Sequence, residues 1–265
     1  MTRDTEHALS FGKAVGDYEL GRPSYPAEAI DWILDESGTA SDTDSHSDPG
    51  TPRTFVDVGA GTGKFTAALR GRGARVLAVE PDDAMRGTLG EKFPDVEVHE
   101  GSAEHLPLAD SSADLVTFAQ AWHWVDVPAA SAEVARVLKP GGMLALVWNI
   151  RDESVDWVAR LTGIIEPSAA EQYDSLTPAV AAPLTTSAHA EFFWDNPLSR
   201  EQLLAMVTSR SYIIALEPDA RAAVVRRVEQ LLDEHPDLAA HSTYTMPYVT
   251  RVTLARVTAC SQALT

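Results

Sequence analysis

The stretch DVGAGTG at residues 57 to 63 constrains the fold of this 265-residue chain most strongly. It ends the apolar run at 54 to 58 and leads into a segment of helical spacing from about 64 to 72. Glycines at such a turn let the backbone approach a ligand closely, and the helix N-terminus behind them offers free N–H groups. The sequence therefore predicts a ligand site at the end of a buried strand.

Short apolar runs alternate with helical segments after residue 54, which is typical of βα units around a parallel sheet. Strands are predicted at 54 to 58, 75 to 80, 96 to 100, 113 to 119, 142 to 149, 190 to 195 and 243 to 257. Helices are predicted at 64 to 72, 83 to 93, 127 to 138, 199 to 211 and 219 to 234. The expected fold is α/β: a Rossmann-like, seven-stranded, mostly parallel sheet, with an antiparallel edge formed by the last two strands and a helical cap.

We expect one domain in five segments. They are a helical lead-in or lid at 1 to 36, a mobile acidic loop at 37 to 53, a ligand-binding α/β core at 54 to 150, a helical cap insertion at 151 to 188, and C-terminal strands and helices at 189 to 265 that complete the sheet. The loop contains no large apolar residue, so it cannot bury enough surface to order itself. Its Asp42, Asp44 and Asp48 resemble a calcium loop, but Ser47 and Arg53 stand where that motif needs glycine and glutamate.

The composition and charge disfavour several classes of partner and several kinds of site. With 39 acidic against 21 basic residues the net charge is −18, which disfavours nucleic acid and anionic membrane surfaces as partners. The single cysteine, Cys260, cannot form an intrachain disulfide, and no CxxC or HExxH spacing predicts a metal site. No apolar run approaches the roughly 20 residues that span a bilayer. We expect a soluble cytoplasmic protein, monomeric or homodimeric, without a metal.

Glu80 ends the second predicted strand, where its carboxylate can accept both hydroxyls of a ribose. The glycine loop and the carboxylate of Glu80 together indicate a nucleoside-containing ligand. The dinucleotide fingerprint needs a glycine at position 64, which is Lys64 here, and Asp57 would repel a pyrophosphate. A cationic ligand suits Asp57 better, and an NAD-dependent oxidoreductase remains a less favoured alternative.

Four motifs resemble the S-adenosylmethionine (SAM) binding domain of class I methyltransferases, specifically the type 11 group. They are VDVGAGTG at 56 to 63, VEPDDAM at 79 to 85, GSAEHLPLADSSADLV at 101 to 116, and LKPGG at 138 to 142. Two flanking stretches, YELGRPSYP at 18 to 26 and QAWHW at 120 to 124, resemble small-molecule methyltransferases similar to trans-aconitate methyltransferase.

The resemblance implies SAM as cofactor and a set of contacts to it. These are Asp57, Gly59, Ala60, Gly61 and Gly63 for the methionine part, Glu80 for the ribose, Pro81, Asp82, Met85, Ser102, Ala103 and Glu104 for the adenine, and Gln120 for the amino acid part and the transferred methyl.

The candidates for the acceptor side are His123, Arg22 and Tyr18. His123 follows the fourth predicted strand at the ligand edge, as a general base or as a packed aromatic neighbour. Tyr18 and Arg22 lie in the segment that folds over the SAM pocket in the resembling family, and Arg22 could hold a carboxylate or be a surface residue. Arg151, Arg210, Ser211 and Tyr212 lie where that family builds its substrate pocket, although a structural role is favoured for them.

The resemblance implies an enzyme that moves a methyl group from SAM to a small-molecule acceptor, with oxygen, as carboxylate or hydroxyl, the expected target. The alternatives are a C-methyltransferase of quinone type and a protein that binds SAM without catalysis. A carboxylate acceptor needs no base and favours cationic side chains in the pocket. A hydroxyl acceptor favours His123 as the base.

Replacing residues 37 to 53 by a short Gly/Ser linker should leave the affinity for SAM within about threefold, because loop length costs little closure entropy. Calorimetric titration of both chains measures this. A calcium-dependent gain in thermal stability that vanishes in the shortened chain would contradict the assignment as a plain acidic linker.

Overall fold

The computed structural model describes residues 15–38, 52–167 and 169–258. Most of the predicted acidic loop, 39 to 51, lies outside these described residues, as do 1 to 14 of the lead-in. Arg53, which we assigned to that loop, instead begins the first strand. The strand pairs along its whole length with its neighbour, and Arg53 is opposite Ala74.

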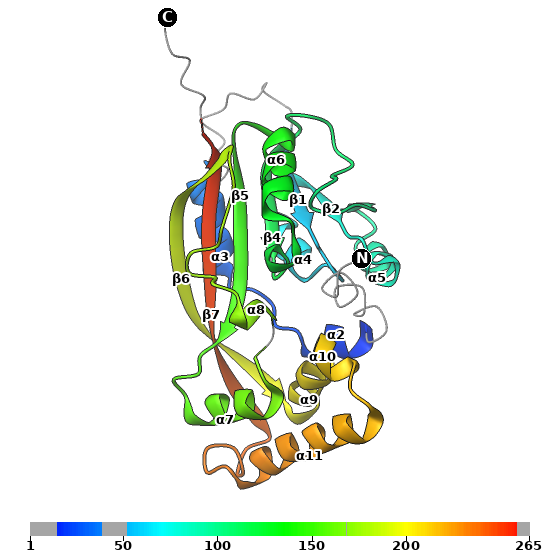
Figure 1. Cartoon of the computed structure of the whole chain (residues 1–265), viewed down its shortest axis with the longest axis vertical. Coiled ribbons are helices and arrows are strands. Elements are labelled where there is room, and N and C mark those ends of the chain that lie inside the picture. Colours follow the sequence, from blue (N-terminus) through cyan, green and yellow to red (C-terminus); the bar gives the residue numbers. More distant parts are fainter. Residues whose placement is uncertain (1–14, 39–51, 168, 259–265) are drawn as a thin grey trace, which may run out of the picture.

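Seven strands form one sheet in the order β3-β2-β1-β4-β5-β7-β6 (Figure 1). Their bounds are Arg53–Val58 (β1), Ala74–Val79 (β2), Glu97–His99 (β3), Ala113–Ala119 (β4), Leu138–Arg151 (β5), Leu184–Ser199 (β6) and Thr243–Val257 (β7). The strand β7 runs antiparallel to both β5 and β6, whereas β1 to β5 pair in parallel. The predicted Rossmann-like sheet with an antiparallel edge is confirmed.

Two strands are longer than predicted. β5 starts at Leu138 rather than 142, because Leu138 pairs with Ala113 before a register shift in β4. β6 covers 184 to 199 rather than 190 to 195, and it pairs with β7 from Leu184 to Ser199. Its side chains are more exposed than those of the inner strands, since β6 is an edge strand, so no apolar run marks its first half.

Helices cover both faces of the sheet. Their bounds are Val15–Gly21 (α2), Ala27–Glu36 (α3), Lys64–Leu69 (α4), Asp83–Lys92 (α5), Val127–Val137 (α6), Asp156–Ile165 (α7), Ala169–Gln172 (α8), Arg200–Thr208 (α9), Ser211–Ile214 (α10) and Pro218–Glu234 (α11). On one face α3 and α4 pack through Ile30, Ile33 and Leu69, and on the other α6 packs through Val134 and Val137. This burial of apolar surface holds the strand ends in fixed positions.

A separate apolar cluster joins α7, α9 and α11 with the neighbouring ends of β6 and β7. Leu161 of α7, Leu203 of α9 and Leu232 of α11 are all at most 1% exposed within it. The predicted helices within 200 to 234 therefore pack together with α7 in this cluster. In Figure 1 these helices lie below the sheet, at the end toward which β5 points.

The described residues contain neither a helix that could cross a membrane nor a group of side chains that could hold a metal ion. No helix in the described ranges is long and apolar enough to cross a membrane. Within the same ranges, no group of three His, Cys, Asp or Glu side chains is placed to hold a metal ion.

Candidate functional site

The glycine loop after β1 adopts a conformation that requires its glycines. Gly59, Gly61 and Gly63 have φ angles of 65°, 58° and 87°, in the left-handed region that other residues rarely adopt. A Cβ at Gly59 would lie 2.7 Å from the Cβ of Ala121. The loop is fixed to β2 because Gly59 N and Ala60 N donate to the carbonyl of Val79. Ala60 lies buried in the loop.

Asp57 lies directly beneath this loop and is fully buried. Its carboxylate accepts hydrogen bonds from the hydroxyls of Thr66, at 2.6 Å, and Thr117, at 3.2 Å. Burial raises the pKa of Asp57 to about 7, although both hydroxyls favour the charged form. Both of these hydrogen bonds come from hydroxyls and not from cations, so the position suits a ligand that carries a positive charge.

Glu80 follows β2 and lies beside the same loop. One carboxylate oxygen accepts from Gly61 N at 2.7 Å, and the other accepts from Asp82 N at 2.9 Å. Each oxygen retains a lone pair, so the carboxylate can accept two further hydrogen bonds, for example from vicinal hydroxyls. Burial raises the pKa of Glu80, and the two backbone N–H groups oppose that shift.

The residues predicted around an adenine ring lie after β2 and β3. Asp82 caps α5 by accepting from Ala84 N and Met85 N, so it has a structural function there. Met85 is buried and Pro81 is exposed. After β3, Ala103 is buried, Ser102 pairs with His105, and Glu104 accepts from the backbone N–H of Asp126.

Gln120 follows β4 in a left-handed conformation, with φ at 60°. Its side-chain nitrogen donates to the carbonyl of Asn149, while its side-chain oxygen is buried without a hydrogen-bond partner among the described residues. Asn149, which the sequence analysis missed, also donates to the carbonyl of Ser24 and accepts from Thr250. It thereby joins the N-terminal segment to β5 and β7.

His123 lies in the short helix Trp122–Trp124 after β4 and is partly buried. Its ring contacts those of Trp124, at 4.7 Å between centroids, and Tyr173, at 6.2 Å. Its Nδ1 is buried without a hydrogen-bond partner within the described structure. Burial, followed by the positive charge of Arg22, lowers the pKa of His123 to about 3, so the ring is neutral at pH 7.

Helix α2 contacts the glycine loop through Glu19. The carboxylate of Glu19 accepts from Thr62 and pairs with Lys92, and its carbonyl accepts from the Lys64 ammonium at 2.8 Å. Gly21 packs so closely on α9 that a Cβ there would meet the backbone of Met206. Tyr18 lies in α2, but its side chain is outside the described part of the structure.

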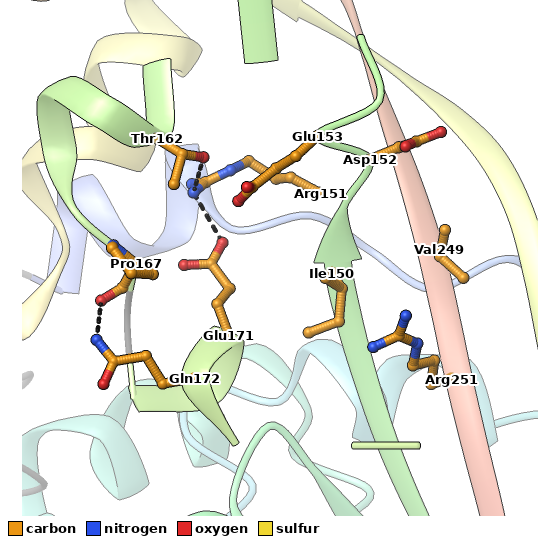
Figure 2. A pocket seen from close by; sticks show the side chains of 10 residues that line it. All are labelled: Ile150, Arg151, Asp152, Glu153, Thr162, Pro167, Glu171, Gln172, Val249 and Arg251. Atoms are coloured by element: carbon orange, nitrogen blue, oxygen red, sulfur yellow. Dashed lines mark hydrogen bonds and ion pairs between the residues drawn. The ribbon is translucent and has the colours of Figure 1, made fainter. Parts of the chain in front are cut away.

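A charged cluster lies at the carboxyl end of β5. For its arginines, Arg151 and Arg210, the sequence favours a structural role. Arg151 and Arg210 are 3% and 5% exposed, and both pair with Glu171 of α8. Figure 2 shows Arg151 directed at Glu171 and Thr162. Tyr212 donates to the carbonyl of Glu166 nearby, and the side chain of Ser211 is not described.

The structure thus brings Asp57, Glu80, Gln120 and His123 to one edge of the sheet, where β1, β2 and β4 end. These groups suit a ligand with a cation near Asp57, vicinal hydroxyls near Glu80 and a donor near Gln120. The chemistry matches the amino group and ribose of SAM. No sequence spacing marked Asn149, Glu19 or Glu171, because their roles depend on contacts across the fold.

Comparisons with known proteins agree with this geometry. Residues 56–146 match the family model described as a methyltransferase domain. An uncharacterized methyltransferase of Mycobacterium tuberculosis is 45% identical over 251 residues, which cover 94% of this chain and 97% of the relative. An uncharacterized methyltransferase of Schizosaccharomyces pombe is 39% identical over 158 residues, or 59% of each chain.

Two solved structures bear on the fold alone, because their identity to this chain is low. A protein provisionally assigned as a type II methyltransferase, from Anaeromyxobacter dehalogenans, aligns with a TM-score of 0.62 at 21% identity, over 89% of this chain and 97% of its own. A second, from Anabaena variabilis, aligns with a TM-score of 0.56 at 18% identity, over 88% of this chain and 98% of its own.

The raised pKa of Asp57 predicts how affinity for S-adenosylhomocysteine changes with pH. The ammonium group of this ligand favours the ionised carboxylate, so protonation of Asp57 competes with binding. With a pKa of about 7, affinity at pH 6 should be about tenfold weaker than at pH 8. Calorimetry at both values measures this, and Asp57→Asn should bind weakly with little pH dependence. An affinity of the unmodified chain that is equal at pH 6 and pH 8 would contradict the role of Asp57.

Proposed function

Because this chain belongs to the class I SAM-dependent methyltransferases, we propose that it transfers the methyl group of SAM to an oxygen atom of a small-molecule acceptor. The observation that carries the proposal is the pairing of two sites at one sheet edge. Asp57, Glu80 and the glycine loop suit SAM, and His123, on which Arg22 acts electrostatically, would lie on the acceptor side.

The arrangement argues against a dinucleotide cofactor. Lys64 is the first residue of α4, at the position where the dinucleotide fingerprint needs a glycine. The fully buried carboxylate of Asp57 lies under the loop, where a pyrophosphate would need a neutral or cationic surface. Both features disfavour an oxidoreductase and are compatible with a cofactor that carries an ammonium group.

When bound, SAM supplies an electrophilic methyl group, and an acceptor lone pair forms the new bond to carbon while the carbon–sulfur bond breaks and leaves a neutral thioether. The chain's main task is to hold both partners in line, since near-attack positioning contributes most of the acceleration. Asp57 and Glu80 would fix the amino and ribose ends. Gln120 would fix the part next to the methyl group.

The proposed acceptor atom is oxygen, as a carboxylate or a hydroxyl. A carboxylate loses no proton on methylation, so it needs no base. A hydroxyl must release a proton, and the neutral ring of His123 can accept a hydrogen bond from it. The low pKa of His123 makes it a weak base, which favours a role in orienting the hydroxyl. Arg22, which acts electrostatically on His123, would attract an acidic acceptor.

Two other functions remain candidates for the same cofactor site. A C-methyltransferase of quinone type would share the SAM contacts and differ in the cap. A protein that binds SAM without catalysis would keep the whole cofactor site. The similarity to trans-aconitate methyltransferase stays a prediction, as do the cytoplasmic location and the monomeric or homodimeric state.

We expect SAM to raise the melting temperature and NADH to leave it unchanged. A ligand at 100 times its dissociation constant stabilises a fold by about 2.7 kcal/mol, which a thermal shift detects. Glu80→Ala should lose most of the shift while remaining folded by circular dichroism. Glu100→Ala, which removes a carboxylate from a mostly exposed side chain, serves as the matched control and should keep it. Protection by NADH without protection by SAM would overturn the proposed function.

His123→Ala should lower turnover of a hydroxyl acceptor by about 10²-fold, the lower end of the range for a lost proton acceptor, because His123 is weakly basic. SAM affinity should stay within about threefold. The readout is steady-state kinetics over a panel of phenols and small carboxylic acids, with SAM consumption measured. Turnover of a carboxylic acid should be insensitive to the change. Full activity of the variant toward a hydroxyl acceptor would assign His123 to packing alone.

A further inference from the structure

Two buried arginines at the end of β5 form the most unusual group in the described part of the chain. Arg151 leaves β5 at its carboxyl end, and Arg210 lies between α9 and α10. Their side chains are only 2% and 6% exposed. Arginine is seldom buried to this degree unless its charge is paired.

One carboxylate serves both guanidinium groups. Glu171 lies 2.9 Å from Arg151 Nη2, and 2.9 Å and 3.1 Å from the two terminal nitrogens of Arg210. Two guanidinium groups thus contact the single carboxylate of Glu171, while Glu153, which lines the same cavity, acts on Arg151 electrostatically. Arg22 is a third positive charge nearby, because it acts on the buried hydroxyl of Tyr248 together with Arg151 and Arg210. Three arginines therefore stand against two glutamates here, in a chain whose net charge is −18.

Several N–H groups of the cluster are unsatisfied. Arg151 Nε and Nη1 and Arg210 Nε are buried without a hydrogen-bond partner among the described residues. Leaving a buried donor without an acceptor is unfavourable, and more so when the donor is charged. A buried ion pair is itself weak support for stability. The fold therefore retains an arrangement that stability alone does not explain.

A cavity gives access to this cluster at Arg151 and Glu171, whereas Arg210 is not among its lining residues. It has a volume of about 440 Å³, and Arg151, Thr162 and Glu171 form part of its wall (Figure 2). Glu171 reaches into it from α8, a helix of only four residues. Two residues later, Tyr173 contacts both Trp148 and His123. The segment that lines the cavity at Glu171 and Gln172 thus continues directly to the ring that contacts His123, a candidate of the acceptor side.

We propose that the acceptor carries a carboxylate which Arg151 and Arg210 bind, and that Glu171 is an exchangeable counter-ion holding this place until the acceptor arrives. The inference rests on the proposed function and specifies its substrate class. A guanidinium pair presents N–H donors in the planar geometry that matches a carboxylate. An incoming carboxylate would supply acceptors for the N–H groups that Glu171 leaves unsatisfied.

The alternative is that Glu171 and the two arginines only stabilise the cap. The two interpretations predict opposite results for Glu171→Gln. If Glu171 is a counter-ion, its neutral replacement removes a competing carboxylate and strengthens the binding of acids. If the cluster is only structural, the replacement loosens the cavity and binding is unchanged or weaker.

The test uses the full chain saturated with S-adenosylhomocysteine and titrated with benzoate and succinate, each matched by its amide, benzamide or succinamide. Calorimetry should detect binding of at least one acid and neither amide. Glu171→Gln should bind that acid about three- to tenfold more tightly, and Arg151→Gln at least tenfold more weakly. Arg160→Gln, which removes an exposed arginine of α7, is the control and should change nothing.

A double variant distinguishes a loss of acid binding from misfolding. Arg151→Gln with Glu171→Gln removes one charge of each sign, so it should fold, as shown by its melting curve, yet bind the acid at least tenfold more weakly. Equal binding of acids and amides, unchanged or weaker binding by Glu171→Gln, or no binding of either acid at 10 mM would overturn the proposal. Failure of the proposed function is recognised separately, because S-adenosylhomocysteine would then not bind in the first titration.

Discussion

The carboxyl ends of the parallel strands meet at one edge of the sheet, and the candidate cofactor residues depend on that constraint for their positions. β1, β2, β4 and β5 are buried on both faces, so most of their residues are apolar and few polar side chains lie within them. Asp57 is one of these few: it is fully buried, and its carboxylate accepts hydrogen bonds from the hydroxyls of Thr66 and Thr117. Under the proposed function, the ammonium group of the cofactor would supply a positive charge near it.

Strands and helices with a regular apolar pattern were predictable from the sequence. β4 and β7 have the predicted bounds because their β-branched and apolar residues alternate or run without interruption. β6 was not predictable at full length, since an edge strand tolerates the polar run TTSAH at 185 to 189. The packing of α7 on α9 and α11 was not predictable, because these helices are distant in the sequence and no local periodicity specifies that partner.

The positions of Asp57 and Glu80 at strand ends were predictable because both residues lie in continuous motifs. Glu80 contacts the glycine loop directly, since its carboxylate accepts from Gly61 N. That these residues hold the cofactor stays a prediction. The acceptor side was less predictable. Asn149 lies within an apolar run, and Glu171 lies in a polar stretch without a motif, so their contacts with Gln120, Arg151 and Arg210 arise only in the folded chain.

The opposition between a strongly acidic chain and its buried arginines, Arg151 and Arg210, has a kinetic consequence. An anionic molecule approaching the chain meets long-range repulsion from a net charge of −18 before it can reach the arginines. Added salt screens that repulsion over about 8 to 10 Å at physiological strength, whereas the buried arginines are screened much less. For such a molecule, encounter should become faster with moderate salt while residence in the cavity changes little, the reverse of the behaviour of an enzyme that attracts its substrate electrostatically.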